Sequence, residues 1–313
     1  MKHLSPIVLF VYNRPEHTKR TVEGLLQNPE AKDSELYIFA DAAKPTASEK
    51  DKANIAKVRE YIHTISGFKN IVIEEASVNK GLAKSTIDGC TKIINQYGDI
   101  IMFEDDDVPT PFFLAYANEC LEKFRDNEKI WCVSGYVDAD IIQPDDGPDV
   151  FLVNRPSSWG FATWKRCWDK VIWDIPTLKG LFAHKGLYSG YDKWCGGDSS
   201  MIMSGLFENR NSSWSTRYNF AAYLNKSYTI LPNKSLIENI GCDGSGTHSH
   251  PKEFHLNLMN RKVIIPDEIE FDSCKNRKLL RSFKLKGVKP TVSNFLHKHP
   301  TIKRITGYLR NKK

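Results

Sequence analysis

Residues 99–111 read Asp-Ile-Ile-Met-Phe-Glu-Asp-Asp-Asp-Val-Pro-Thr-Pro, an apolar run that ends in four consecutive carboxylates. Residues 100–103 predict a short buried strand, and the carboxylates at 104–107, here called the acidic turn, follow at its C-terminal end. Pro109 and Pro111 are expected to end regular structure. Adjacent carboxylates repel one another unless a cation neutralises them, and hard oxygen ligands favour Mg²⁺ or Mn²⁺ bridging to a phosphate. A solvated acidic turn is the alternative interpretation.

Apolar runs alternate with helical patterns before the acidic turn. The sequence predicts strands at 6–12, 36–40 and 70–74, and helices at 16–26, from the polar stretch 44–52 to about 65, and at 82–97. This alternation predicts an α/β fold with a mostly parallel, helix-covered sheet. Ligands of such sheets bind at the carboxyl ends of strands. Asn13, Arg14, Asp41 and the aspartates of the acidic turn are therefore expected to share one rim.

The second half of the chain is richer in tryptophan. We expect a helix at 111–124, strands at 130–135 and 151–154, and an acidic loop or seam at 138–149. Six of the seven tryptophans lie between 159 and 214. The spacing of Trp164 and Trp168 predicts one apolar face of a helix, whereas Trp159 beside Gly160 suggests a platform for the apolar face of a sugar. Three regions are predicted, 1–150 for nucleotide-sugar binding, 151–265 for the acceptor and catalysis, and 266–313 as a basic tail.

A glycine-rich segment at 241–250 carries Asp243, His248 and His250. Glycine allows close backbone approach and unusual backbone angles. Two histidines on such a segment are candidates for ligand binding, although a structural or solvated role remains the alternative.

Composition places the chain among ordinary globular proteins. Its 313 residues are 41% hydrophobic and 26% charged, enough for one large or two closely packed domains. The seven cysteines are widely spaced without a Cys-x-x-Cys pair, which favours free thiols in a reducing cytoplasm. No apolar run approaches 18 residues and no signal peptide is evident, so a membrane span is not expected.

The basic character is concentrated in residues 275–313, which hold 13 Lys and Arg and no Asp or Glu. The preceding residues hold 31 basic and all 38 acidic residues. Apolar residues at helix-like spacings between the cations predict a helix on an anionic membrane surface. A solvated disordered tail is the alternative. Nucleic acid is not expected as a partner, because acidic clusters in the predicted cleft repel phosphate backbones.

Several separated motifs together resemble a known group of enzymes. Glu104-Asp105-Asp106, Trp131-Cys132-Val133-Ser134 and Ser158-Trp159-Gly160-Phe161 are similar in order and spacing to N-acetylglucosaminyltransferase I and to bacterial family-2-like transferases of surface polysaccharide synthesis. The resemblance spans about residues 6–248 and implies a GT-A fold, a nucleotide-sugar donor and Mn²⁺ or Mg²⁺ at an Asp-x-Asp-type (DXD) motif. It implies that Asp106 contacts the metal, with Glu104 and Asp105 near the nucleotide and ribose. Asp107 leaves this register open by one position.

The resemblance assigns further donor contacts. Arg14, in Tyr12-Asn13-Arg14, would contact the diphosphate or base, and Asp41 would contact the uracil. A guanidinium suits phosphate independently of any resemblance. Lys80 and Lys84, at the start of a predicted helix, would add cationic contacts near the donor. His248 is expected at the metal, and Trp159, Gly160 and Trp214 are expected at the acceptor.

The resemblance fails at the general base, because Ser212 and Ser213 stand where the related transferases have an aspartate before tryptophan. An inverting transfer needs a carboxylate to accept the proton of the acceptor hydroxyl. Asp198, in Gly196-Gly197-Asp198, is the predicted replacement. Asp243 is the second candidate.

These features predict a metal-dependent, inverting glycosyltransferase. It would move a hexosyl or N-acetylhexosaminyl group from a UDP-sugar to a hydroxyl of a growing, lipid-linked glycan of the lipopolysaccharide or capsule type, as a peripheral protein on the cytoplasmic face of the cell membrane. The alternatives are a nucleotidyltransferase of sugar activation and a non-catalytic glycan-binding protein. Residues 12–15 lack the glycine-rich phosphate loop usual in nucleotidyltransferases.

Overall fold

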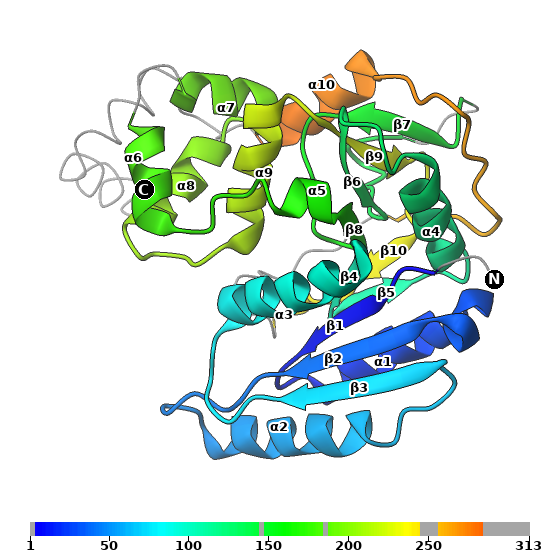
Figure 1. Cartoon of the computed structure of the whole chain (residues 1–313), viewed down its shortest axis with the longest axis vertical. Helices are drawn as coiled ribbons and strands as arrows, with labels where there is room; N and C mark the ends of the chain where they lie inside the picture. The colour runs from blue at the N-terminus through cyan, green and yellow to red at the C-terminus, as the bar shows by residue number, and fades with distance from the viewer. Residues whose placement is uncertain (1–3, 144–146, 184–186, 245–255, 284–313) are drawn as a thin grey trace, which may run out of the picture.

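The structure is a computed structural model that describes residues 4–143, 147–183, 187–244 and 256–283 (Figure 1). Its first half contains β1 Ile7–Val11, α1 Pro15–Leu26, the 3-10 helix η1 Pro29–Asp33, β2 Glu35–Ala40, α2 Glu49–Ile62, β3 Asn70–Glu75, α3 Leu82–Tyr97 and β4 Asp99–Glu104. Each strand and helix predicted for this half is present, with small shifts at the ends. The local apolar periodicity therefore determines this part of the fold.

The second half adds shorter elements. They are β5 Asp107–Pro109, α4 Phe113–Lys123, β6 Ile130–Ser134, β7 Val150–Val153, β8 Phe161–Trp164, α5 Lys165–Trp168, α6 Ile175–Phe182, α7 Leu187–Cys195, α8 Ser199–Phe207, α9 Trp214–Asn225, β9 Tyr228–Pro232, β10 Ile237–Asn239 and α10 Ser273–Ser282. The predicted helix after the acidic turn and the predicted strands near 130 and 151 correspond to α4, β6 and β7.

Among the described residues, eight strands form one sheet in the order β3-β2-β1-β4-β8-β6-β9-β7. Four of its seven pairings are parallel, namely β1 with β2, β1 with β4, β2 with β3, and β6 with β9. The predicted α/β class with a mostly parallel, helix-covered sheet is confirmed. Strands from both sides of the predicted boundary at residue 150 lie in this sheet, so the two predicted halves share one core.

The helices cover both faces of the sheet. Right-handed crossovers place α1 and α2 on one face and α3, which returns the chain to β4, on the other. Accordingly, α1 packs against α2, whereas α3 packs against β1, β4 and α9. The carboxyl ends of β1, β2 and β4 therefore meet at one edge, and the acidic turn follows β4 there (Figure 1).

One local expectation is wrong, and one is met with an addition. A short strand, β5, starts within the acidic turn and pairs antiparallel with β10 in a separate two-stranded sheet, and it ends at Pro109 as expected. Pro109 is tolerated because it lies at the end of this short strand. Trp164 ends β8, and only Trp168 lies in a helix, so their spacing is not one helical face. Both side chains are nevertheless buried, as the core interpretation required.

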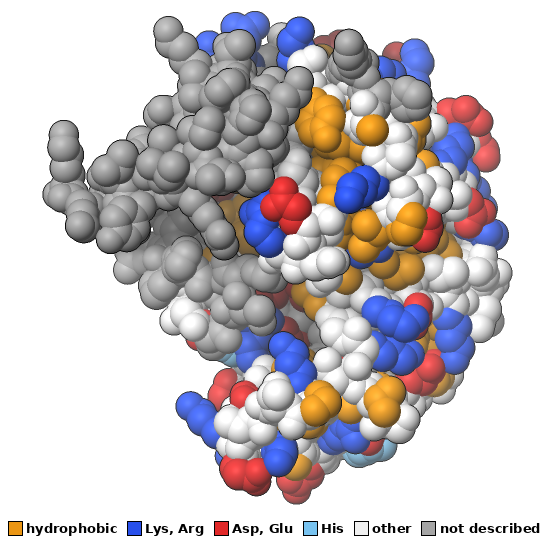
Figure 2. Space-filling view, turned by 90° about the vertical axis from the view of Figure 1, so that its left-hand side faces the viewer, with side chains coloured by type: hydrophobic (Ala, Val, Ile, Leu, Met, Phe, Trp, Pro, Cys, Tyr) orange, Lys and Arg blue, Asp and Glu red, His pale blue; other side chains and the backbone are white. Residues whose placement is uncertain are grey.

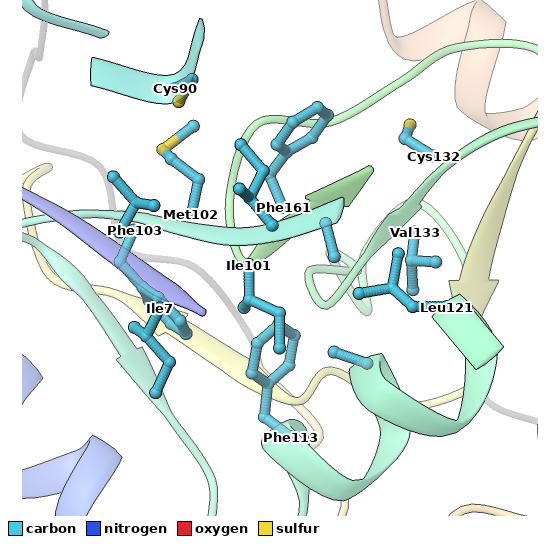
Figure 3. Packing of buried hydrophobic residues seen from close by; sticks show 14 of the residues in the cluster. Ile7, Cys90, Ile101, Met102, Phe103, Phe113, Leu121, Cys132, Val133 and Phe161 are labelled. Atoms are coloured by element: carbon cyan, nitrogen blue, oxygen red, sulfur yellow. The ribbon is translucent and has the colours of Figure 1, made fainter. Parts of the chain in front are cut away.

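The core is densest around β4, which lies between β1 and β8. Ile101, Met102 and Phe103 of this strand are fully buried, and Figure 3 shows their side chains directed to both sides of the strand. Phe113 of α4 packs against Phe103 with ring centroids 5.3 Å apart, and Cys90 of α3 belongs to the same cluster. Each such side chain contributes about 1.5 to 3 kcal/mol on burial. The strand that carries the acidic turn is therefore firmly anchored.

The first part of the predicted basic tail belongs to the folded structure. Lys275 and Asn276 of α10 are buried. Lys275 Nζ donates to Asn233 Oδ1 at 3.1 Å, and Asn154 N donates to Asn276 Oδ1 at 2.9 Å. This part of α10 therefore packs against the sheet instead of lying on a membrane. Residues 284–313 lie outside the described residues, and their membrane role stays a prediction.

None of the helices formed by the described residues is both long and apolar enough to cross a membrane. On the face that Figure 2 presents, acidic and basic side chains of the described residues alternate. All seven cysteines are free thiols, and five of them are buried, as the absence of a paired motif predicted.

Asp149 anchors the segment before α10. It accepts hydrogen bonds from Arg261 Nη1 at 2.6 Å, Arg261 Nη2 at 2.7 Å and Ile264 N at 2.8 Å. These hydrogen bonds, those from Arg261 first, lower the pKa of Asp149. The carboxylate therefore stabilises the fold above the unfolded pKa of about 4, and this stability is lost as the pH falls through the folded pKa.

We expect Asp149→Asn to lower the free energy of unfolding near neutral pH by about 1 to 2 kcal/mol, because Arg261 is half exposed and its charge is partly screened. Urea denaturation at about pH 7, 5 and 3 measures the effect, and the difference from wild type should shrink at the lowest pH. The exposed Asp126→Asn is the control. A difference that does not change with pH would contradict this account.

Candidate functional site

The acidic turn lies beside the end of β1 and the start of α1. The register pairs Phe10 of β1 with Glu104, so the residues after β1 reach the same edge as the carboxylates. Arg14, the residue before α1, forms ion pairs with Asp105 and Asp106, and its Nη1 is 2.9 Å from Asp106 Oδ2. The shared rim is therefore confirmed for Arg14 and the acidic turn.

The three aspartates differ in how their oxygens are used. Both oxygens of Asp105 accept from Arg14. Asp107 Oδ1 accepts from Asn239 Nδ2 at 3.0 Å, and Asp107 Oδ2 accepts from Gly160 N at 3.4 Å. Asp106 Oδ2 contacts Arg14, but Asp106 Oδ1 is buried without a hydrogen-bond partner among the described residues. Because an unpaired buried oxygen is costly, Asp106 Oδ1 is the atom of the turn that most needs a further positive partner.

Burial raises the pKa of three carboxylates of the turn, Glu104, Asp105 and Asp107. Burial, together with the charge of Asp106, raises the pKa of Glu104 to about 7. Burial also raises the pKa of Asp105 despite the neighbouring Arg14, and it raises the pKa of Asp107 well above its usual range with help from Asp106 and Glu104. One guanidinium therefore does not neutralise four neighbouring carboxylates.

A distant segment closes over the turn. The antiparallel pairing of β10 with β5 places Asn239 opposite Asp107. Ile240 N then donates to the backbone oxygen of Asp106 at 2.9 Å. A Cβ at Gly241 would overlap Asp106 Oδ2, so only glycine allows the backbone to approach this carboxylate so closely. The glycine-rich segment thus begins directly against the acidic turn.

Asp41 holds the loop that precedes α3. Its two oxygens accept from Asn79 Nδ2 and from the backbone nitrogens of Ala42, Lys80 and Gly81, all at 2.8 to 2.9 Å. This carboxylate is therefore satisfied by the protein itself. Its expected contact with a uracil stays a prediction, and its demonstrated role is to shape the loop beside the rim.

The other expected donor residues are spread along the rim. Tyr12 is half-buried just after β1, and Asn13 Nδ2 donates to Asp51 Oδ1 at 2.8 Å, at the start of α2. The ammonium groups of Lys80 and Lys84 lie 3.7 and 2.9 Å from Asp88 Oδ2, so both cations pair within α3 and its preceding loop. None of these contacts brings them to the acidic turn. His248 lies outside the described residues.

A pocket of about 310 Å³ is lined in part by Trp159, and we call it the Trp159 pocket. The residues that line it include Tyr136, Arg155, Trp159, Ser215, Leu279 and Phe283. The rings of Tyr136 and Trp159 meet edge to face with centroids 4.4 Å apart. Gly160 is not itself a platform. Its φ of +61° favours glycine, and a Cβ at this position would overlap the side chain of Ile237.

Asp198 forms an ion pair with Arg155 at the edge of this pocket. Asp198 Oδ1 lies 2.7 Å from Arg155 Nη1, and Asp198 Oδ2 lies 3.2 Å from Arg155 Nη2. The sequence did not indicate this partner. The guanidinium uses one acceptor site on each oxygen, so in the predicted catalytic role an acceptor hydroxyl would bind Asp198 at a remaining site.

The remaining candidates lie near the acidic turn. Trp214 is 3% exposed, packs against Phe161, and its Nε1 donates to Glu104 Oε1 at 3.4 Å. Trp214 therefore supports the turn from the core and does not offer an exposed ring to an acceptor, contrary to the sequence-based expectation. Asp243 belongs to the segment that closes over the turn, here called the closing segment (residues 239–243). Its Oδ2 lies 3.3 Å from His17 Nε2, so Asp243 lies beside α1.

Sequence reasoning missed Asn239, His17 and Arg155, because each contacts a candidate residue far away along the chain. Within the described residues, no group of three or more His, Cys, Asp or Glu side chains is arranged to hold a metal ion.

Neither a protein-family model nor a curated protein matches the sequence. Among solved structures, the chain is similar to S. aureus TarS residues 1–349, with 10% identity, a TM-score of 0.43, and coverage of 75% of this chain and 59% of that one. It is also similar to the mannosyltransferase PcManGT from Pyrobaculum calidifontis in complex with GDP-Man and Mn²⁺, with 10% identity, a TM-score of 0.41, and coverage of 70% and 69%. A longer TarS structure is covered over 37% of its length. These similarities are too distant to assign an activity.

Proposed function

We propose that the protein is a GT-A-type glycosyltransferase that transfers a sugar from a nucleoside diphosphate, with a UDP-sugar as the proposed donor. The observation that carries the proposal is Asp106 Oδ1, which is buried without a hydrogen-bond partner among the described residues, at the carboxyl end of a central strand and beside Arg14. Nucleotide ligands of open α/β sheets bind at such strand ends. A divalent cation that also binds the diphosphate of the donor would supply the positive charge that the turn lacks.

The donor set fits Mg²⁺ or Mn²⁺ held mainly by Asp106. Asp105 is engaged by Arg14, and both oxygens of Asp107 accept protein hydrogen bonds, which favours Asp106 in the register that the sequence left open. Mg²⁺ commonly takes one or two carboxylates and completes its shell with phosphates and water. A bound divalent cation would neutralise charge on the leaving diphosphate.

The protein's own residues would position the donor. Arg14 is held in place by Asp105, so its guanidinium is oriented beside the expected phosphate position without further ordering. Asp41 fixes the 79–81 loop, which would border the nucleotide base. Gly241 brings the closing segment against Asp106 and restricts the access of water to that carboxylate.

The finer features follow the same proposal. We propose an inverting transfer of a hexosyl or N-acetylhexosaminyl group to a glycan hydroxyl, with Asp198 as the base and Asp243 as the alternative. A lipid-linked surface glycan as the acceptor, and attachment of residues 284–313 to an anionic membrane on its cytoplasmic side, stay predictions. They rest on the nine Lys and Arg residues among residues 284–313 of the sequence.

Thermal-shift measurements with UDP and Mn²⁺ test the proposal. We expect UDP plus Mn²⁺ to raise the melting temperature of the wild type more than UDP alone, because only the native state binds the complex. Asp106→Ala should lose the Mn²⁺-dependent part. The matched control is Asp126→Ala at an exposed position outside the site. An unchanged Mn²⁺-dependent shift in Asp106→Ala would refute the metal assignment, and no shift with UDP, GDP or other nucleoside diphosphates would refute the donor class.

A further inference from the structure

We propose that the Trp159 pocket binds an amphipathic acceptor, a glycoside whose sugar lies at the Trp159 end and whose apolar group lies against α10. This inference rests on the proposed function, because it names the acceptor class of that reaction. The pocket, at about 310 Å³, has the volume of a small ligand site.

The lining of the pocket divides into two chemical halves. One half comprises the hydroxyl and amide groups of Ser157, Ser215 and Asn219 and the carboxylate of Asp138, together with the ring of Trp159. The other half is aliphatic, and its residues Ile142, Leu231 and Leu279 belong to or pack on one hydrophobic cluster. A free sugar would satisfy only the first half. A molecule that joins a sugar to an apolar group would match both.

The polar half adjoins the acidic turn through two independent connections. Trp159 is followed by Gly160, whose backbone nitrogen donates to Asp107 Oδ2 at 3.4 Å. Ser215 is preceded by Trp214, whose Nε1 donates to Glu104 Oε1. The Trp159 end is therefore joined through chain neighbours to the turn where the donor diphosphate is proposed to bind, and we place the acceptor sugar at this end.

The apolar half includes residues at the end of α10. Leu279 lies in this helix and Phe283 follows its last residue, and Arg155 Cζ lies 3.6 Å from the centroid of the Phe283 ring. The charge of Arg155 is paired with Asp198, so this side of the pocket favours an uncharged group over an anionic one. Leu279 and Phe283 therefore favour an apolar group of the ligand, and they belong to a segment outside the large sheet.

Binding of hexyl β-glycosides tests this assignment. Hexyl glycosides of glucose, galactose, mannose and N-acetylglucosamine are compared with the free sugars by calorimetry. At least one hexyl glycoside should bind more tightly than its free sugar. Leu279→Ala should weaken that binding by about tenfold, the usual effect of removing apolar contact in a pocket. Leu280→Ala is the matched control, because Leu280 lies on the same helix and does not line the pocket. Phe283→Ala probes the same wall if Leu279→Ala does not fold.

The outcomes separate this inference from the proposed function. Equal binding of free sugars and hexyl glycosides, equal effects of Leu279→Ala and Leu280→Ala, or no binding of any hexyl glycoside would overturn the amphipathic pocket. Mn²⁺-dependent hydrolysis of UDP-glucose, UDP-galactose and UDP-N-acetylglucosamine is measured in the same preparations. Hydrolysis without glycoside binding refutes the pocket alone, whereas glycoside binding without hydrolysis or transfer refutes the proposed function.

Discussion

The Arg14→Met variant is expected to lose about 3 to 5 kcal/mol of unfolding free energy, the usual result of removing one partner from a buried ion pair. Arg14 lies against Asp105 and Asp106, whose side chains are only 7% and 13% exposed. Methionine preserves most of the apolar stem but leaves two carboxylates without their cation. Urea denaturation monitored by tryptophan fluorescence measures the loss.

The matched control is Arg20→Met in α1, the helix that follows Arg14. Arg20 pairs with Glu238 at 3.5 Å, and both side chains are substantially exposed, so its removal should change stability by less than about 1 kcal/mol. The double variant Arg14→Met/Asp105→Asn should recover part of the loss, because one buried negative charge is removed as well. Similar losses for Arg14→Met and Arg20→Met would show that the acidic turn does not depend on Arg14.

Asp198→Asn is expected to lower turnover by about 100-fold to 10,000-fold and to leave donor affinity nearly unchanged, if this carboxylate is the general base. Asparagine keeps the shape of the side chain and can still accept from Arg155, but it does not take up a proton. Initial rates of sugar transfer at saturating donor and acceptor measure turnover, and calorimetry with UDP measures donor affinity.

Two further variants serve as the control for this experiment and as the test of the alternative base. Asp192→Asn changes a neighbouring carboxylate that accepts from Ser200 at 2.7 and 2.8 Å and has no role in the proposed chemistry, so turnover should stay near that of the wild type. Asp243→Asn tests the alternative base in the closing segment. Normal turnover of Asp198→Asn with a large loss in Asp243→Asn would transfer the role to Asp243 and leave Asp198 as a structural partner of Arg155.

The sequence was most informative where the structure is local. Strands β1 to β4 and their crossover helices carry clear apolar periodicity; β1, β2 and β3 pair in chain order, and β4 pairs with β1. In the second half, β8 inserts between β4 and β6, and β10 pairs with the three-residue strand β5. Such short strands depend on distant partners for their stability, so their own sequences carry little signal.

The same distinction applies to the site. Arg14 and the acidic turn could be placed together because both follow the carboxyl ends of neighbouring strands. The partners of Asp107 and Asp198 could not be predicted, since Asn239 and Arg155 reach them through tertiary packing. Trp214 illustrates a related error, because an aromatic residue in an expected acceptor region turned out to be buried beneath Glu104.

The pairing of Asp107 with Asn239 also determines when the acidic turn can become buried during synthesis of the chain. The two residues are 132 positions apart, so at ordinary rates of translation Asn239 is made on the order of 10 seconds after Asp107. During that interval the nascent chain has the strands β1 to β4 but not the segment that covers the carboxylates. The acidic turn must stay hydrated on the ribosome, and its buried, charge-strained form arises only once the C-terminal third of the chain has been synthesised.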